Sequence, residues 1–408
     1  MRHDRFPLLS SIVTISLLAS CALPLSEGSS LSGQAPKLHG FVAPAKLESD
    51  SHIVEGCEKA LSAYGSFASK IVKDKAMRSE SNSVYSPLSH YLCQATVVSL
   101  LDNPEKETLN SLGASSTEEL ASFVDELVRL ESLVTDDPDY YGIVEMANLV
   151  ANFDEYWSKE KVDIVAERLH AAYLDDYGSR ETSIAEWKKE LSHDKLKNPA
   201  SIELENAMIT FVSGLYVDLL YELSLNEETK DAPFDGEGEY PFLQGETYGS
   251  LYEDEEVLAF SQSCRARDYR IRYVMPKVAQ LDDYIEDVDY VSLFDKTSPK
   301  DKYVFEVPSV SIASQWSLSD LGKAAGFRGQ ENYRFLSGGH PYEALESTQS
   351  IDLGFKYDGV KAYAESKVVM IPQSAPVGIV SLNRPFAFEL VGRDGAVLIH
   401  GRVKTLDV

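Results

Sequence analysis

The sequence lacks the short motifs of several common enzyme classes. It contains no G-x-S-x-G nucleophile elbow, no phosphate-binding P-loop, no H-E-x-x-H pair and no EF-hand loop. Its eight histidines stand singly. No set of residues forms a recognisable nucleophile, base and oxyanion hole. We therefore expect a protein that is not an enzyme and that has neither a cofactor nor a metal site.

Basic residues and cysteines are also scarce. The 38 Lys and Arg residues face 65 Asp and Glu residues, which gives a net charge of -27. This balance argues against a nucleic-acid partner, because binding to a phosphate backbone depends on an excess of Lys and Arg. Four cysteines without a C-x-x-C pair predict neither a disulfide framework nor a zinc site. The chain also has no internal repeat.

The only long apolar stretch lies at the N-terminus. Arg2 and Arg5 precede residues 6–19, a stretch that is short for a membrane span and is typical of a secretory signal. Leu18–Cys21, LASC, resembles the bacterial lipobox, which would place a lipid on Cys21 after cleavage before that residue. An ordinary signal peptide cut nearby is the alternative. We expect export across the cytoplasmic membrane, with the protein anchored to a membrane through Cys21 or extracellular.

The expected organisation is one large domain behind this leader. It comprises a lipoprotein signal peptide at 1–20, a flexible tether at 21–50 and a single domain at 51–408. Helical periodicity covers 53–73, 87–101, 120–130 and 158–174. Strand-like patterns cover 144–153, 208–221, 269–276, 303–312, 351–357, 384–392 and 396–403. Helices early and strands late favour an α+β fold.

Five regions, in order, carry a family resemblance. NSVYSPLS at 82–89 is similar to the serpin signature that begins a buried helix under the main sheet. The other matching regions are 184–221, 305–327, 351–359 and 383–403. The resemblance covers about residues 50–408. It implies an α+β serpin-like fold with a large mixed main sheet, smaller antiparallel sheets and an exposed reactive loop.

The resemblance also implies an inhibitory mechanism. A serpin traps its protease covalently, and the cleaved loop inserts into the main sheet as a new strand. Insertion requires alternate loop residues to fit a packed interior. Counting from the hinge residue Gly359, one alternate set is small or apolar throughout, and the other set holds every charge. The first set is Val360, Ala362, Ala364, Ser366, Val368 and Met370.

The reactive bond can be placed only by analogy. The best match is Gln373–Ser374, and counting back from Arg384 gives a register one residue later. Val369 and Met370 are secondary candidates. The implied partner is a serine protease, or alternatively a cysteine protease, and the inhibitor is expected to be a monomer.

Several positions depart from the inhibitory pattern. Val360 stands where Thr is usual, and Tyr357 stands where Glu is usual. The polar shutter under the main sheet would consist of Ser86, Ser89, Ser213 and Gln349. Serpins commonly have Asn and His at the last two of these positions. The departures keep a second hypothesis open, in which the chain is a non-inhibitory surface lipoprotein that acts as a binding module.

Overall fold

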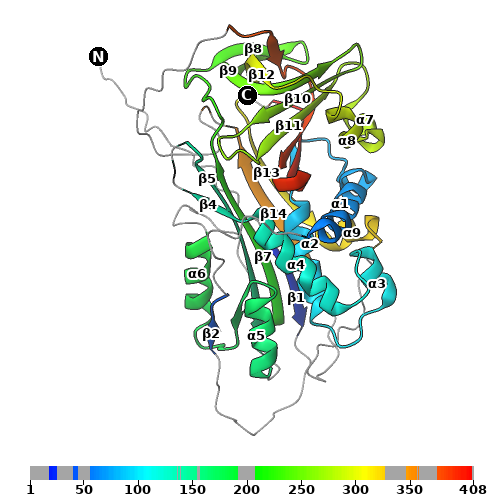
Figure 1. The fold of residues 1–408 in the computed structure, drawn as a ribbon, viewed down its shortest axis with the longest axis vertical. Helices are drawn as coiled ribbons and strands as arrows, with labels where there is room; N and C mark the ends of the chain where they lie inside the picture. Colours follow the sequence, from blue (N-terminus) through cyan, green and yellow to red (C-terminus); the bar gives the residue numbers. More distant parts are fainter. Residues whose placement is uncertain are drawn as a thin grey trace, which may run out of the picture.

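Two β-sheets and a set of helices make up the described part of the protein (Figure 1). The computed structural model describes residues 18–24, 40–44, 56–135, 137, 139–153, 157–191, 207–326, 346–355, 357 and 375–406. The α+β class expected from the sequence is confirmed.

The main sheet is the longer of the two layers in Figure 1. Its described strands follow the order β13-β14-β1-β7-β5-β6-β2, and β4 pairs with β5. Their bounds are β13 Ser311–Ser317, β14 Glu346–Gly354, β1 Leu18–Pro24, β7 Ala207–Leu219, β5 Gly142–Asn152, β6 Ala171–Leu174, β2 Phe41–Val42 and β4 Leu133–Thr135.

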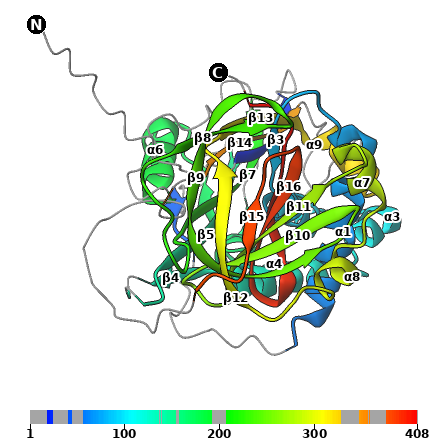
Figure 2. The ribbon, with the colours of Figure 1, turned by 90° about the horizontal axis from the view of Figure 1, so that it is seen from above.

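The second sheet is seen from above in Figure 2, with α7 and α8 at one side. Its described strands follow the order β15-β12-β9-β10-β11-β16-β17-β3, and β8 pairs with β9. Their bounds are β15 Ile379–Ser381, β12 Asp301–Pro308, β9 Glu237–Glu253, β10 Val257–Ser263, β11 Arg270–Pro276, β16 Phe386–Val391, β17 Val397–Val403, β3 Ser83–Tyr85 and β8 Lys230–Phe234.

The helices lie around and between the sheets. Their bounds are α1 Glu58–Val72, α2 Pro87–Ser99, α3 Lys106–Ser111, α4 Thr117–Glu131, α5 Lys159–Glu167, α6 Arg180–Leu191, α7 Leu281–Asp287, α8 Tyr290–Phe294 and α9 Leu318–Ala324. Short 3-10 turns occupy Lys75–Met77 and Arg393–Gly395. No helix in these described ranges is long and apolar enough to cross a membrane.

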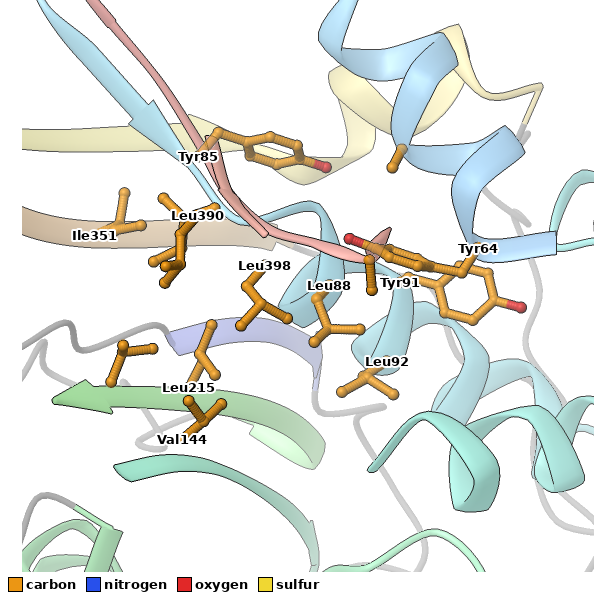
Figure 3. Close-up of a cluster of buried hydrophobic side chains, with 14 of the residues drawn as sticks. Tyr64, Tyr85, Leu88, Tyr91, Leu92, Val144, Leu215, Ile351, Leu390 and Leu398 are labelled. Carbon is orange, nitrogen blue, oxygen red and sulfur yellow. The ribbon is translucent and has the colours of Figure 1, made fainter. Parts of the chain in front are cut away.

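The core centres on α2, which is buried along its whole length. Leu88 and Leu92 of this helix lie beside Leu215 of β7 and Leu398 of β17 (Figure 3). A helix buried on every side depends on tertiary packing more than on intrinsic propensity. The two sheets therefore share one apolar core that is built around this helix.

Two sequence predictions are corrected by the structure. The helix expected over 158–174 ends at Glu167, and β6 follows, because His170 adopts a positive φ of 45° that ends the helical path. The single strand expected over 303–312 is two strands in different sheets. Pro308, which has no N–H to donate, ends β12, and β13 starts at Ser311 in the main sheet.

The segment expected to be a leader and tether contains two strands. β1 lies within the main sheet, and β2 pairs with β6 at the edge of that sheet. Whether residues 1–20 are a signal peptide and 21–50 a tether stays a prediction. The rest of residues 1–50, apart from 40, 43 and 44, lies outside the described residues.

Glu131, the last residue of α4, is a fully buried carboxyl group. Its Oε2 accepts a hydrogen bond of 3.1 Å from the backbone N–H of Arg393. Loss of hydration raises the pKa of Glu131 to about 8. The Glu131 carboxyl lies so close to the 392–395 turn that a Cβ added to Gly392 would be 1.9 Å from Oε2.

We predict that Glu131 makes the stability of the fold pH-dependent. Between about pH 4.5 and 8 the folded chain keeps a proton that unfolded Glu131 loses, so the free energy of unfolding falls as pH rises through this window. Glu131→Gln should remove this loss and be more stable than the wild type above pH 8, by on the order of a few kcal/mol. Denaturant unfolding at pH 5 and pH 8.5 measures the difference. Glu107→Gln, at an exposed site, should leave the pH dependence unchanged, and an equal dependence in all three chains would contradict the assignment.

Candidate functional site: the centre of the main sheet

The candidate site is the strand position between β7 and β14, which we call the insertion site. β1 occupies this position and runs antiparallel to both neighbours, so β7 and β14 are parallel to one another. Figure 1 shows β1 in dark blue beside them. Each flanking strand thus presents a backbone edge of N–H and C=O groups that a central strand can pair with.

Beneath the insertion site, α2 begins at Ser86. This residue is extended, with φ of -109° and ψ of 105°, and its Oγ accepts a hydrogen bond from the N–H of Ser89 at 3.2 Å. Pro87 fills the first helical position, where a missing N–H costs nothing. The Ser86 hydroxyl also donates to the carbonyl of Leu398 at 2.7 Å. The start of α2 is therefore tied to β17 of the second sheet.

Gln349 connects β14 to the same helix start. Its Oε1 accepts from the N–H of Ser86 at 2.9 Å, and its Nε2 donates to the carbonyl of Ser86 at 3.0 Å. Both residues are fully buried. One side-chain amide thus bonds to both backbone groups of a buried residue. The carbonyl of Ser86 also accepts from the N–H of His90 at 3.3 Å, so the N–H of Ser86 is the group for which the loss of Gln349 would be costly.

Ser89 connects α2 to β7, on the other side of the insertion site. Its hydroxyl donates to the carbonyl of Ser213 in β7 at 3.0 Å. The hydroxyl of Ser213 itself has no hydrogen-bond partner in the described part of the chain. The structure therefore brings Ser86, Ser89, Ser213 and Gln349 together, which we call the shutter cluster, but Ser213 takes part through its backbone and not through its side chain.

Sequence reasoning missed a second polar contact next to this cluster. The hydroxyl of Tyr85 and Nδ1 of His90 lie 2.7 Å apart, and burial lowers the pKa of His90 to about 3. Trp316 of β13 donates from Nε1 to the carbonyl of Val84 at 2.7 Å. The sequence placed His90 one helical turn after Ser86 and so near the shutter cluster. A single histidine, however, does not indicate which side chain it bonds to.

Most of the predicted loop residues fall outside the described residues. These are the hinge residues Gly359, Val360, Ala362 and Ala364 and the reactive-bond residues Gln373 and Ser374. The described chain resumes at Ala375, where Val377 donates its N–H to the carbonyl of Lys302 at 2.9 Å. β15 then runs parallel to β12. Residues 358–374 therefore connect the end of β14 in one sheet to the edge of the other sheet.

Cys21, the predicted lipid attachment site, lies within β1. It is in register with Ser347 of β14 and Phe211 of β7. Ala19 is in register with Ser213 and Gln349. The N-terminal strand thus passes directly over the shutter cluster.

Comparison with known proteins identifies the architecture. No protein-family model matches the sequence, and no curated protein matches it. Solved structures do match. The thermophilic serpin tengpin in its native state has a TM-score of 0.69 at 17% identity, over 90% of this chain and 96% of that chain. The chain has the serpin fold.

Two further serpin-fold structures differ in what they do. Serpin48 of the insect Tenebrio molitor, described as a highly specific serpin, has a TM-score of 0.66 at 16% identity, over 87% of this chain and all of that one. Human thyroxine-binding globulin in complex with its ligand has a TM-score of 0.68 at 14% identity, over 85% of this chain and 98% of that one. The fold thus occurs in serpins of differing activity.

We predict that Gln349→Ala weakens the link between β14 and α2. The buried N–H of Ser86 would lose its partner, and the carbonyl of Ser86 would keep only its bond from the N–H of His90. The cost should be about 1–3 kcal/mol in the free energy of unfolding. Gln315→Ala, at an exposed position of the neighbouring strand β13, should change stability by less than about 0.5 kcal/mol. Urea unfolding compares the two, and losses of equal size would show that the amide contacts do not stabilise the cluster.

Proposed function

We propose that the protein inhibits a serine protease by inserting its cleaved loop into the main sheet. The observation that carries this proposal is the geometry of the insertion site. β14 ends at Gly354, and a chain that turns back from this end runs antiparallel to β14. β1 lies in the insertion site and runs antiparallel to β14. A loop that turned back after β14 would therefore have the strand direction that this site accepts.

The sequence of the loop supports the proposal. Residues Val360, Ala362 and Ala364 form a small or apolar alternate set, which suits the buried face of a strand. Insertion would add about ten ladder hydrogen bonds at about 0.5–1.5 kcal/mol each. The gain is on the order of ten kcal/mol, comparable with the stability of a whole domain. This energy is sufficient to pull on an attached enzyme.

The covalent step would follow ordinary serine-protease chemistry. The hydroxyl oxygen of the protease serine attacks the carbonyl carbon of Gln373, and the protease histidine takes the hydroxyl proton. The bond to the nitrogen of Ser374 then breaks, and that nitrogen leaves with the proton. An ester joins Gln373 to the protease. Insertion would distort the protease oxyanion hole, and removal of one such donor alone slows catalysis by about a hundredfold to a thousandfold.

This proposal predicts opposite results for two loop substitutions. Ala364→Arg places a charge in the alternate set that should enter the sheet, so the loop should be cut as a substrate and no complex should persist. Glu365→Arg changes the other set and should leave trapping intact. Gel electrophoresis of the exported chain after incubation with a panel of serine proteases would show a band that survives denaturation.

The same gels can overturn the proposal. If the wild-type chain is cut between 367 and 375 and no protease yields a stable band, it is not an inhibitor of these enzymes. If both substituted chains trap equally well, inhibition does not depend on insertion of this alternate set. Cleavage at Val369 or Met370, mapped by mass spectrometry, would move the reactive bond without changing the mechanism.

A cavity gives a specific reason to consider a second function, the binding of a small molecule. The cavity, of about 230 Å³, lies among α1, α8, β11, β16 and β17. Three of its lining residues have a polar atom with no hydrogen-bond partner in the described ranges: Nε of Arg272, the hydroxyl of Tyr290 and Oε2 of Glu389. Unpaired buried polar atoms are rare, and a bound ligand would satisfy them. Apolar walls at Leu61 and Ala68 favour an amphipathic molecule.

We predict that anilinonaphthalene sulfonate, an amphipathic anion, binds this cavity with enhanced fluorescence. Gly65 lies in α1 at the cavity, and a Cβ added there meets no atom within 4 Å. Gly65→Trp should therefore block the cavity and abolish the signal, whereas Gly65→Ala should keep it. Equal fluorescence of both variants would contradict binding at this place.

A further inference from the structure

One wall of the cavity among α1, α8, β11, β16 and β17 is the tight turn that joins β16 to β17. Residues 394–397 of this connection line the cavity. The N–H of Gly392 donates to the carbonyl of Ala396 at 2.7 Å, and the N–H of Ala396 donates to the carbonyl of Arg393 at 3.1 Å. Because these bonds close the turn, a displacement of its first residues would also move the cavity wall.

The buried carboxyl group of Glu131, in α4, contacts the first residues of this turn. Its Oε2 accepts from the N–H of Arg393, and no room remains between Oε2 and Gly392 for one added carbon atom. Its Oε1 has no hydrogen-bond partner among the residues that the structure describes. A protonated carboxyl group fits this place. A carboxylate would be a buried charge with one oxygen lacking a donor, which is costly unless water reaches it.

Five charged or titratable residues interact with the Glu131 carboxyl group: Tyr64 of α1, Asp268 and Tyr269 before β11, and Arg393 and Asp394 of the turn. The two aspartates have the same charge as an ionised Glu131 and oppose its ionisation. Both tyrosine hydroxyls already donate to backbone carbonyls, those of Val397 and Glu131. The Arg393 guanidinium has the opposite charge, but it donates to the carbonyl of Leu130 at 3.2 Å. In the described chain, none of the five supplies a donor to Oε1.

We propose that the proton on Glu131 keeps the 392–396 turn closed, and that loss of this proton opens the turn and releases the ligand of the cavity. Hydration of the carboxylate requires the turn to move away from α4, and residues 394–397 move with it. The proposal rests on the proposed binding of a small molecule at this cavity, since it concerns the control of that site. Ligand affinity should therefore be high at neutral pH and low in mildly alkaline solution.

The size of the change follows from the pKa of Glu131, which burial raises to about 8. If only the protonated protein binds, the apparent affinity scales with the protonated fraction and falls about tenfold between pH 7 and pH 9. By linkage, binding at pH 8 should take up about half a proton. Burial raises the pKa of Tyr64 and of Tyr290 in the cavity walls well above the usual range, so both stay neutral at these pH values.

Anilinonaphthalene sulfonate is the probe, because its sulfonate stays ionised from pH 7 to pH 9. Titration calorimetry at pH 7 and pH 9 measures its affinity, and two buffers with different heats of ionisation at pH 8 measure the proton uptake. Only binding that Gly65→Trp abolishes is counted as binding at the cavity. The wild type and Glu107→Gln, at an exposed site, should lose about tenfold in affinity. Glu131→Gln, which cannot ionise, should bind equally at both pH values and take up no proton.

Gly392→Ala tests the contact at a single pH. The added Cβ would lie 1.9 Å from Oε2 of Glu131, so the turn cannot keep its present contact even when Glu131 is protonated. This chain should bind the probe at least about fivefold more weakly than the wild type at pH 7. Gly65→Ala, in the α1 wall, adds a Cβ that meets no atom within 4 Å and should leave the affinity unchanged. Full affinity of Gly392→Ala would show that the cavity does not depend on this contact.

The outcomes separate this proposal from the binding function on which it rests. If the wild type binds at the cavity equally well at pH 7 and pH 9, or if Glu131→Gln loses as much affinity as the wild type, control by Glu131 is wrong and the cavity remains a binding site. If Gly65→Trp removes no binding at pH 7, the cavity is not a ligand site, and both proposals fail.

Discussion

The arrangement depends on the hydrogen bonds between the first turn of α2 and the two edges of the insertion site. Gln349 of β14 and the carbonyl of Ser213 in β7 both bond to the Ser86–Ser89 turn. The Ser86 hydroxyl extends the connection to β17 in the second sheet. Any strand that enters between β7 and β14 must pass over this turn. The cluster thus holds apart two parallel strands that do not pair with each other.

Such a sheet has two strand edges in its middle that do not pair with each other. Two facing strand edges in the middle of a sheet must be filled by another segment, be hydrated, or close upon each other. β1 fills them here, and the sequence of the loop at 360–370 suits the same position. The protein therefore has more candidate strands than positions for them. A fold with this property can store free energy that a later rearrangement releases.

Much of this architecture could be predicted from the sequence. Helical and strand-like periodicities placed α1, α2, β7, β16 and β17 close to their observed bounds. The Ser86-Pro87 pair predicted the start of α2 because a serine cap followed by proline is a local signal. The approach of Gln349 to Ser86 came only from the family resemblance, since no local pattern relates residues so distant in the sequence.

Other features were beyond a local prediction. The switch from α5 to β6 depends on the parallel edge of β5, and the break between β12 and β13 depends on two different sheets. Within the described residues the hydroxyl of Ser213 has no hydrogen-bond partner. This could not be foreseen, because a serine at this position of the family pattern suggested a side-chain contact. The position of β1 depends on edges that exist only once β7 and β14 are in place.

Hydrogen exchange of the backbone amides at 360–370 would show whether the cleaved loop enters the main sheet. The measurement compares intact and loop-cleaved protein with Ala19→Pro, in which proline removes a ladder N–H from β1, so that β1 does not compete for the site. We predict that these amides exchange freely in the intact protein and become protected, together with the facing edges of β7 and β14, after cleavage. Free exchange at 360–370 in the cleaved protein would mean that the loop stays outside the sheet, and the insertion account would be wrong.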